Sequence, residues 1–388
     1  MPHPNLAISC QFDAGAIEVV SLADPRDIQL RIRADNASEF AQWFHFALHG
    51  AAGVPVRLRF LNAGQCAYPK GWEGYRIAVS TDRQHWYRID TTYGGGELGT
   101  ELTPDANSLY FAYFEPYSHE RHLDLIGSAA SSELVTPQHL GTTLEGRDMT
   151  LLHIRQPDLP TDLPADTSLK KVWLIARQHP GETMAEWFAE GFLERLLDAD
   201  DPVSRRLLQR CEFYVLPHMN PDGAVRGNLR TNAAGANLNR EWLEPSAERS
   251  PEVLLVRQKM LETGVDLFLD AHGDEGLPYN FVVGTDGIAG FTPRIAALQD
   301  AFKAAWLAAS PDFQVAQGYP PARPSAGNTA LATNWVGQQF GCLAFTIEMP
   351  FKDNADLPDP LTGWSGERSK KLGASVLQPV LVLADQLR

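Results

Sequence analysis

The amino-acid sequence predicts an α/β fold, a mixed sheet with helices on both faces, preceded by an antiparallel β-sandwich domain. Two observations lead to this prediction. Up to about residue 115, short alternating or aromatic-rich segments are separated by turn residues, which is typical of antiparallel strands. From residue 118 onward, apolar segments of strand length alternate with helical segments, which is typical of an α/β sheet. We therefore expect a sandwich domain over residues 1–117 and an α/β domain over residues 118–388.

The predicted strands of the sandwich are rich in β-branched and aromatic side chains. Stretches such as "ADNAS", "TDRQ" and "YGGGE" separate them, and their Asn, Asp and Gly residues favour tight turns. The strands expected in this domain are "IQLRIR" (28–33), "WFHFAL" (43–48), "VRLRFL" (56–61), "YRIAV" (75–79) and "LYFAYF" (109–114).

The α/β domain has longer apolar segments, which indicate strands buried in the interior. In such sheets, ligands bind beyond the carboxyl ends of the strands. We expect strands at "KVWLIA" (171–176), "EFYVLP" (212–217), "DLFLDAHG" (266–273), "NFVVG" (280–284) and "LAFTIEMP" (343–350), and helices near 183–197, 251–263, 294–309 and 366–387.

The composition is that of a soluble globular protein and argues against several classes of partner. The chain has 388 residues with a formal net charge of -15, which opposes binding to nucleic acid and to anionic membranes. No apolar stretch is long enough to span a membrane, and the first twenty residues do not resemble a secretory signal. Four cysteines without C-x-x-C spacing fit a reducing compartment, so we expect a cytoplasmic protein.

Two strand ends carry residues that can bind a metal. His179 and Glu182 follow the strand at 171–176, and His272 follows the apolar part of the strand at 266–273. Two histidines and a glutamate would form a catalytic zinc site with one position left open. Taken singly, Glu182 could instead favour a helix dipole, and His272 could bond a backbone carbonyl.

A long polar segment at 218–242 contains Arg230, Asn239 and Arg240. Planar donors beside a metal would suit a carboxylate or a developing oxyanion, whereas a solvated loop is the alternative. Asn220 to Gly223 are interpreted as a plain turn. Glu348 lies near the end of an apolar strand, where it would be either a salt-bridge partner or a base beside the metal.

These motifs occur in the order H-P-G-E, N-P-D-G, G-N-L-R, N-L-N-R, A-H-G and F-T-I-E. In this order they resemble the zinc metallocarboxypeptidases of the carboxypeptidase A superfamily, and more narrowly the cytosolic carboxypeptidases, which include tubulin deglutamylases. The N-terminal segments "FDAGAIEVV", "QWFHFAL" and "YFAYFEPYS" resemble the sandwich that precedes the catalytic domain in that branch.

The resemblance implies a carboxypeptidase-like sheet of about eight strands and a peptide hydrolase that acts on the C-terminus of a peptide or protein. It implies one Zn²⁺ per chain, bound by His179, Glu182 and His272, with Glu348 as general base and acid. It further implies that Arg230 polarises the scissile carbonyl and that Asn239 and Arg240 bind the substrate through its terminal carboxylate.

Two positions depart from the family pattern. Tyr319 is the candidate for a tyrosine that closes over the substrate, although it lies farther from Glu348 than the family spacing implies. Leu331 stands where glutamate-trimming relatives have an arginine, which argues against a glutamate preference unless Arg323 or Lys352 substitutes.

Two other functions compete with a carboxypeptidase. An acyl-amino-acid amidohydrolase of the aspartoacylase type shares this zinc architecture, and the two differ in the size of the leaving group. A non-catalytic binding protein is the other alternative, but the complete set of metal-binding and acid–base residues argues against it.

Overall fold

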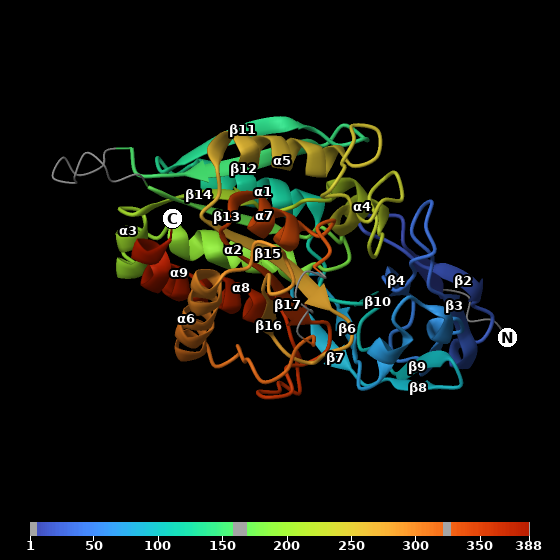
Figure 1. Ribbon diagram of the computed structural model, residues 1–388. Coiled ribbons are helices and arrows are strands. Elements are labelled where there is room, and N and C mark those ends of the chain that lie inside the picture. Colours follow the sequence, from blue (N-terminus) through green and yellow to red (C-terminus); the bar gives the residue numbers. More distant parts are fainter. Residues whose placement is uncertain (1–5, 158–168, 321–326, 388) are drawn as a thin grey trace.

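Figure 1 shows the computed structural model, which describes residues 6–157, 169–320 and 327–387. The N-terminal part, in blue, lies at one end of a larger α/β part, and the two chain ends lie on opposite sides of the view. Within the described residues, no helix is long and apolar enough to cross a membrane.

The N-terminal part is a sandwich of two sheets, as the sequence predicts. In the described part of the chain, the sheets have five strands each, in the orders β1-β4-β10-β6-β7 and β2-β3-β5-β9-β8. Neighbouring strands run antiparallel except for β3 and β5, which pair in parallel. The strands are β1 (Ala7–Ser9), β2 (Glu18–Ser21), β3 (Ile28–Arg31), β4 (His45–His49), β5 (Val56–Phe60), β6 (Ile77–Ser80), β7 (Tyr87–Ile89), β8 (Thr92–Gly94), β9 (Glu97–Leu102) and β10 (Ser108–Ala112).

Aromatic side chains from both sheets fill the interior of the sandwich. The ring of Phe60 in β5 lies 4.8 Å from that of Phe44, just before β4, and 6.2 Å from that of Phe46. Phe46 stacks on Phe111 of β10 at 4.9 Å. Because side chains alternate between the two faces of a strand, the period of two in the sequence places one apolar set inside.

The α/β part is built on a mixed sheet in the order β11-β12-β14-β13-β15-β17-β16. These are seven strands among the described residues, against the eight or so that the family resemblance implied. The central strands β14, β13, β15 and β17 are parallel, and the edges are antiparallel. Their bounds are β11 (Val135–Thr142), β12 (Asp148–Ile154), β13 (Lys170–Ala176), β14 (Cys211–Leu216), β15 (Leu267–Asp274), β16 (Phe281–Val283) and β17 (Leu343–Pro350).

Helices cover both faces of this sheet (Figure 1). Val172 and Leu174 of β13 belong to the core under α2, whereas Trp173 and Ile175 belong to the core under α5 and α7. Burial on both faces explains the continuous apolar sequence of these strands. The helices are α1 (His119–Ala130), α2 (Met184–Leu196), α3 (Pro202–Leu207), α4 (Pro221–Arg226), α5 (Pro251–Thr263), α6 (Pro293–Ala309), α7 (Ala332–Phe340), α8 (Gly366–Ser375) and α9 (Leu377–Leu383).

The last predicted helix, 366–387, is divided into α8 and α9 in the structure. Pro379 has no backbone N–H, so it cannot donate to the carbonyl of Ser375, where α8 ends. A proline in the first turn of a new helix is tolerated, which allows α9 to begin at Leu377.

Candidate active site

The polar residues of the site lie at the carboxyl ends of neighbouring parallel strands. β13 and β15 pair side by side up to Ala176 and Ala271, and β15 pairs with β17 so that His272 lies opposite Glu348. His179 lies in the turn that joins β13 to α2. The sheet therefore brings segments far apart in the sequence to one edge, as expected of an α/β sheet.

The turn between β13 and α2 has an unusual backbone. Arg177 adopts φ of 59°, a left-handed conformation that is rare for residues other than glycine. Its guanidinium compensates by donating to the carbonyl of Pro180 at 2.9 Å and to Glu186 at 2.7 Å. At Gly181 a Cβ atom would lie 2.9 Å from the carbonyl oxygen of Leu229, so only glycine fits without a shift.

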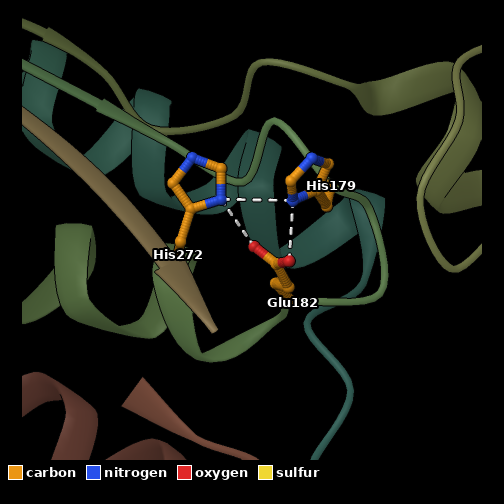
Figure 2. Close-up of side chains that lie close together, drawn as sticks. All are labelled: His179, Glu182 and His272. Carbon is orange, nitrogen blue, oxygen red and sulfur yellow. Dashed lines mark hydrogen bonds and ion pairs between the residues drawn. The ribbon is translucent and has the colours of Figure 1, made fainter. Parts of the chain in front are cut away.

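His179, Glu182 and His272 converge on one point (Figure 2). Nδ1 of His179 lies 2.7 Å from Oε1 of Glu182, and Nδ1 of His272 lies 2.8 Å from Oε2. The two Nδ1 atoms are 3.2 Å apart. All three residues are buried, and their candidate ligand atoms lie within 4.8 Å of one another.

The other ring nitrogens have polar partners. Nε2 of His179 lies 3.0 Å from Oδ1 of Asn237, and Nε2 of His272 lies 3.0 Å from Oδ2 of Asp270. When each Nε2–H donates to its oxygen, the lone pair of each Nδ1 faces the shared point. Two nitrogens and a carboxylate arranged in this way fit Zn²⁺, which prefers borderline nitrogen and oxygen ligands.

Burial and charge act differently on the three groups. Burial, with a contribution from Arg230, lowers the pKa of His179 to about 4, so that this ring is neutral. Burial opposes the charge of Glu182, but the two histidines outweigh it and lower the pKa of the carboxyl. At His272 burial again opposes the charge, but Asp270 and Glu182 raise its pKa. A divalent cation would take the place of that proton.

A cavity of about 690 Å³ opens over this cluster. The other residues predicted for the site, namely Arg230, Asn239, Arg240, Tyr319 and Glu348, all line it, and so does Leu331. One wall comes from the sandwich, whose segment 67–71 contributes Tyr68 and Lys70 among others. The sequence had not suggested that the sandwich lines the site.

Arg230 lies between the cluster of His179, Glu182 and His272 and the sandwich. One of its terminal nitrogens is 3.7 Å from Oε1 of Glu182, and its side chain is 12% exposed. The guanidinium lies over the rings of Phe40 and Tyr68, at 5.5 and 5.6 Å from their centroids. Aromatic faces hold the charge without occupying its N–H donors, which leaves them available to a ligand.

Asn239 and Arg240 lie in a short 3₁₀ helix, Leu238–Arg240. Oδ1 of Asn239 accepts the backbone N–H of Ala332 at 2.9 Å, and its Nδ2 is 3.5 Å from Nε2 of His272. Arg240 donates to the carbonyl of Asn239 at 2.6 Å. Partial burial, with Arg230 nearby, lowers the pKa of Arg240. Two cations facing one cavity favour an anionic ligand.

Glu348 and Glu275 are two buried carboxyl groups in the cavity wall. Among the described residues, neither Oε2 of Glu348 nor Oε1 of Glu275 has a hydrogen-bond partner. Burial raises the pKa of Glu348 above its usual range, and it raises the pKa of Glu275 to about 8. The sequence indicated Glu348 but not Glu275, although Glu275 lies only three residues after His272 in "AHGDE".

Tyr319 and Leu331 also belong to the wall of the cavity. The hydroxyl of Tyr319 donates to Oδ2 of Asp274, and its ring packs edge-on against Phe281 at 5.0 Å. Arg323 lies outside the described residues. Lys352 donates to the carbonyl of Gly276 at 3.4 Å.

Two family models match the chain. Residues 123–361, more than half of the chain, match the family model described as zinc carboxypeptidase, and residues 8–114 match that of the cytosolic carboxypeptidase N-terminal domain. The chain belongs to the zinc carboxypeptidase family. It is therefore a zinc-dependent peptide hydrolase.

Relatives resemble this zinc carboxypeptidase along nearly all of its length. An uncharacterized protein of Zymomonas mobilis is 47% identical over 99% of this chain and 98% of its own. The structure of a metallo-carboxypeptidase from Pseudomonas aeruginosa, in complex with (2-guanidinoethylmercapto)succinic acid, is 50% identical with a TM-score of 0.94, covering 98% of this chain and 100% of the other.

Human cytosolic carboxypeptidase 4 is more distant, at 28% identity over 68% of this chain. The match spans only 27% of that protein, so the chain corresponds to about a quarter of its length. The family and the N-terminal match nevertheless agree with the resemblance found in the sequence motifs.

Proposed function

We propose that this carboxypeptidase removes the C-terminal residue of peptides or protein tails, with one zinc ion bound by His179, Glu182 and His272. The observation that carries the proposal is the convergence of three buried ligand atoms at the wall of a cavity that also contains two arginines and a buried carboxyl group. A zinc ion bound there would lower the pKa of a water molecule toward about 7 and polarise a carbonyl group.

Glu348 is proposed as the general base and acid. A base must reach the attacking water, and Glu348 lies opposite His272 in the strand register with a carboxyl oxygen free of protein partners among the described residues. Its raised pKa, caused first by burial, suits a group that takes a proton from water and then donates it to the leaving amine.

Arg230 is proposed to stabilise the negative charge that develops on the carbonyl oxygen. Its guanidinium is 3.7 Å from a candidate zinc ligand, and it is nearly buried, so its charge is weakly screened. Asn239 and Arg240 are proposed to bind the terminal carboxylate. A guanidinium can hold a carboxylate through two parallel hydrogen bonds, and the proximity of Arg230 makes an anion favourable there.

For the side chain that is removed, we propose a neutral or apolar residue rather than glutamate. Leu331, Val283 and Thr346 supply an uncharged part of the cavity wall. Lys352 donates to a backbone carbonyl instead. Tyr319 is proposed to close over the substrate, which requires its hydroxyl to leave Asp274.

We further propose that the boundary between the sandwich and the catalytic domain falls between residues 117 and 118, in the segment that joins β10 to α1. A cytoplasmic location is proposed from the names of the cytosolic relatives and from the scattered spacing of the four cysteines.

The test uses matched peptides that end either in a free carboxylate or in an amide, with products read by mass spectrometry. We expect the free acid to lose one residue and the amide to remain intact. Arg240→Lys should raise KM for the free-acid peptide and reduce the difference in cleavage between acid and amide, because lysine cannot bind a carboxylate through two parallel hydrogen bonds. Arg249→Lys is the control, since Arg249 pairs with Glu241 at 3.1 Å and does not line the cavity. Equal cleavage of acid and amide would rule out an exopeptidase.

A competition among peptides ending in Glu, Leu and Lys addresses the side-chain preference. We expect Leu to be cleaved at least as fast as Glu. If the peptide ending in Glu were cleaved at least tenfold faster than the one ending in Leu, a basic residue elsewhere in the cavity would have to contact the substrate.

A further inference from the structure

The sandwich contacts the loop that carries Arg230 through one buried carboxylate. Asp35 lies just after β3 and is 6% exposed. Its Oδ1 accepts the backbone N–H of Leu229 at 2.6 Å, and its Oδ2 accepts those of Arg230 at 2.8 Å and Thr231 at 2.9 Å. The Thr231 hydroxyl adds a contact of 3.1 Å to the same Oδ2. Three successive backbone donors on one carboxylate fix the local backbone conformation.

The turn that contains Asp35 also contacts the side chain of Arg230. The backbone N–H of Asp35 donates to the carbonyl of Phe40 at 2.7 Å, which closes the turn. The Phe40 ring then lies under the Arg230 guanidinium, and Tyr68, also from the sandwich, provides a second aromatic contact. The backbone and the side chain of Arg230 are thus both held by the N-terminal part of the chain.

The same loop is attached on its other side to the metal-binding turn. The carbonyl of Leu229 accepts the N–H of Gly181 at 2.8 Å, and Gly181 lies between His179 and Glu182 in the sequence. On the sandwich side, Asn36 adds a further contact, since its Nδ2 donates to the carbonyl of Ala233 at 2.8 Å. A loop held at both sides has a defined position relative to the cluster, whereas the loss of one attachment would leave it free to shift.

We propose that Asp35 is a positioning residue for Arg230, and that the sandwich is therefore a working part of the catalytic centre. This inference rests on the role proposed above for Arg230. A displacement of about 1 Å in a catalytic group can cost roughly 100-fold in rate. Asp35→Asn keeps the size of the side chain but places an amide N–H₂ against donors, so it weakens the attachment with little change in volume.

The test is a double-mutant cycle on Asp35 and Arg230, with kcat and KM measured on a free-acid peptide. We expect Asp35→Asn to lower kcat at least tenfold with a smaller change in KM, and Arg230→Ala to lower it about 100-fold or more. In the Arg230→Ala background, Asp35→Asn should change kcat by less than twofold. Zinc content should match that of the parent in all variants, because none of them alters a ligand.

Asp27→Asn serves as the control. Asp27 is also a carboxylate of the sandwich, but it pairs with Arg59 at 2.8 Å within that domain, and its loss should leave kcat unchanged. If Asp35→Asn does not fold, Thr231→Val replaces it in the cycle, because it removes one donor to Asp35 at similar volume. Its expected loss is about two- to fivefold, again absent without Arg230.

Three results would overturn the inference, and they differ in what else they overturn. An equal fold loss from Asp35→Asn in the parent and in Arg230→Ala would show that Asp35 acts independently of Arg230, and the role of Arg230 would stand. Parental kcat in Arg230→Ala would instead show that Arg230 itself has no role in turnover. A loss of zinc in Asp35→Asn would assign Asp35 a purely structural role.

Discussion

Asp270 should control how tightly zinc binds although it is not a ligand. It is completely buried, and its Oδ2 lies 3.0 Å from Nε2 of His272 and 2.7 Å from Nε2 of Gln178. The carboxylate fixes the proton on the remote nitrogen of His272 and makes Nδ1 more basic. Asp270→Asn keeps the shape but removes the charge. Both neighbours contact the same oxygen, so the amide carbonyl can still accept from them, but it lacks the negative charge that makes Nδ1 of His272 more basic.

The size of the effect follows from the burial of this contact. Loss of a carboxylate that supports a metal-binding histidine weakens affinity by about 10- to 100-fold, or about 1.4 to 2.7 kcal/mol. Both partners are at most 2% exposed, so solvent does not screen the interaction. We therefore expect the upper part of that range for Asp270→Asn.

The assay is a competition for zinc between the metal-free protein and a chelator of known affinity at pH 7.5. Asp266→Asn is the control, because Asp266 lies just before the other end of β15 and accepts the backbone N–H of Lys171 at 2.8 Å. Its zinc affinity should equal that of the parent. An affinity for Asp270→Asn within threefold of the parent would refute the reasoning, provided that the variant remains folded.

Three further predictions concern the base, the specificity and the stability. Glu348→Gln should keep zinc content and KM but lower kcat by at least about 100-fold, since the amide cannot accept a proton; parental kcat would assign proton transfer to another group. Leu331→Arg should increase the preference for Glu over Leu termini at least tenfold, or about 1.4 kcal/mol, in a peptide competition, and an unchanged preference would contradict it. Burial lowers the pKa of His45 from 6.5 to about 3. Between these two values the unfolded chain binds a proton at His45 and the folded chain does not, so the stability of the fold falls as the pH drops below 6.5. When the pH is lowered from 7.5 to 5, the free energy of unfolding measured with denaturant should fall by about 2 kcal/mol more in the parent than in His45→Phe. Equal decreases in the two proteins would contradict this prediction.

Periodicity predicted the elements that are buried on a regular pattern. The apolar strand at 343–350 and the helix at 251–263 coincide with β17 and α5. The short edge strands β7 and β8 and the helix α1 were not predicted. Edge strands are half exposed and short, so their composition differs little from that of turns.

Turn residues and helix caps use the same side chains, and this explains one wrong interpretation. Asn220 to Gly223 were expected to form a plain turn, but Asn220 caps α4, and its Oδ1 accepts the N–H of Gly223 at 3.1 Å. Asn favours both conformations because its side chain bonds to backbone two or three residues ahead. Its Nδ2 also donates to the carbonyl of Gln178 at 2.9 Å, a tertiary contact that the sequence pattern does not show.

The proposed metal ligands could be named from sequence because they lie at or just beyond the carboxyl ends of two neighbouring strands, where topology alone brings residues together. That Asp35, Tyr68 and Glu275 lie at or near the site could not be inferred from the sequence. Asp35 contacts Arg230 across 195 positions of sequence and between two domains, and no periodicity relates such positions. Their roles depend on how the sandwich packs against the α/β part.

The proposed zinc ligands are held within the α/β domain, whereas Arg230 is held by the sandwich, so mutations in the two parts should have different effects. His179, Glu182 and His272 lie on a turn and a strand of the α/β sheet, and their polar partners Asn237 and Asp270 belong to the same domain. Arg230 shares that domain but is held from the sandwich. Zinc affinity should therefore respond to changes such as Asp270→Asn and not to changes at Asp35, whereas turnover should respond to both. The proposed metal site and the proposed oxyanion site would then be separable in one chain by mutating Asp270 or Asp35, neither of which is a proposed ligand of zinc or substrate.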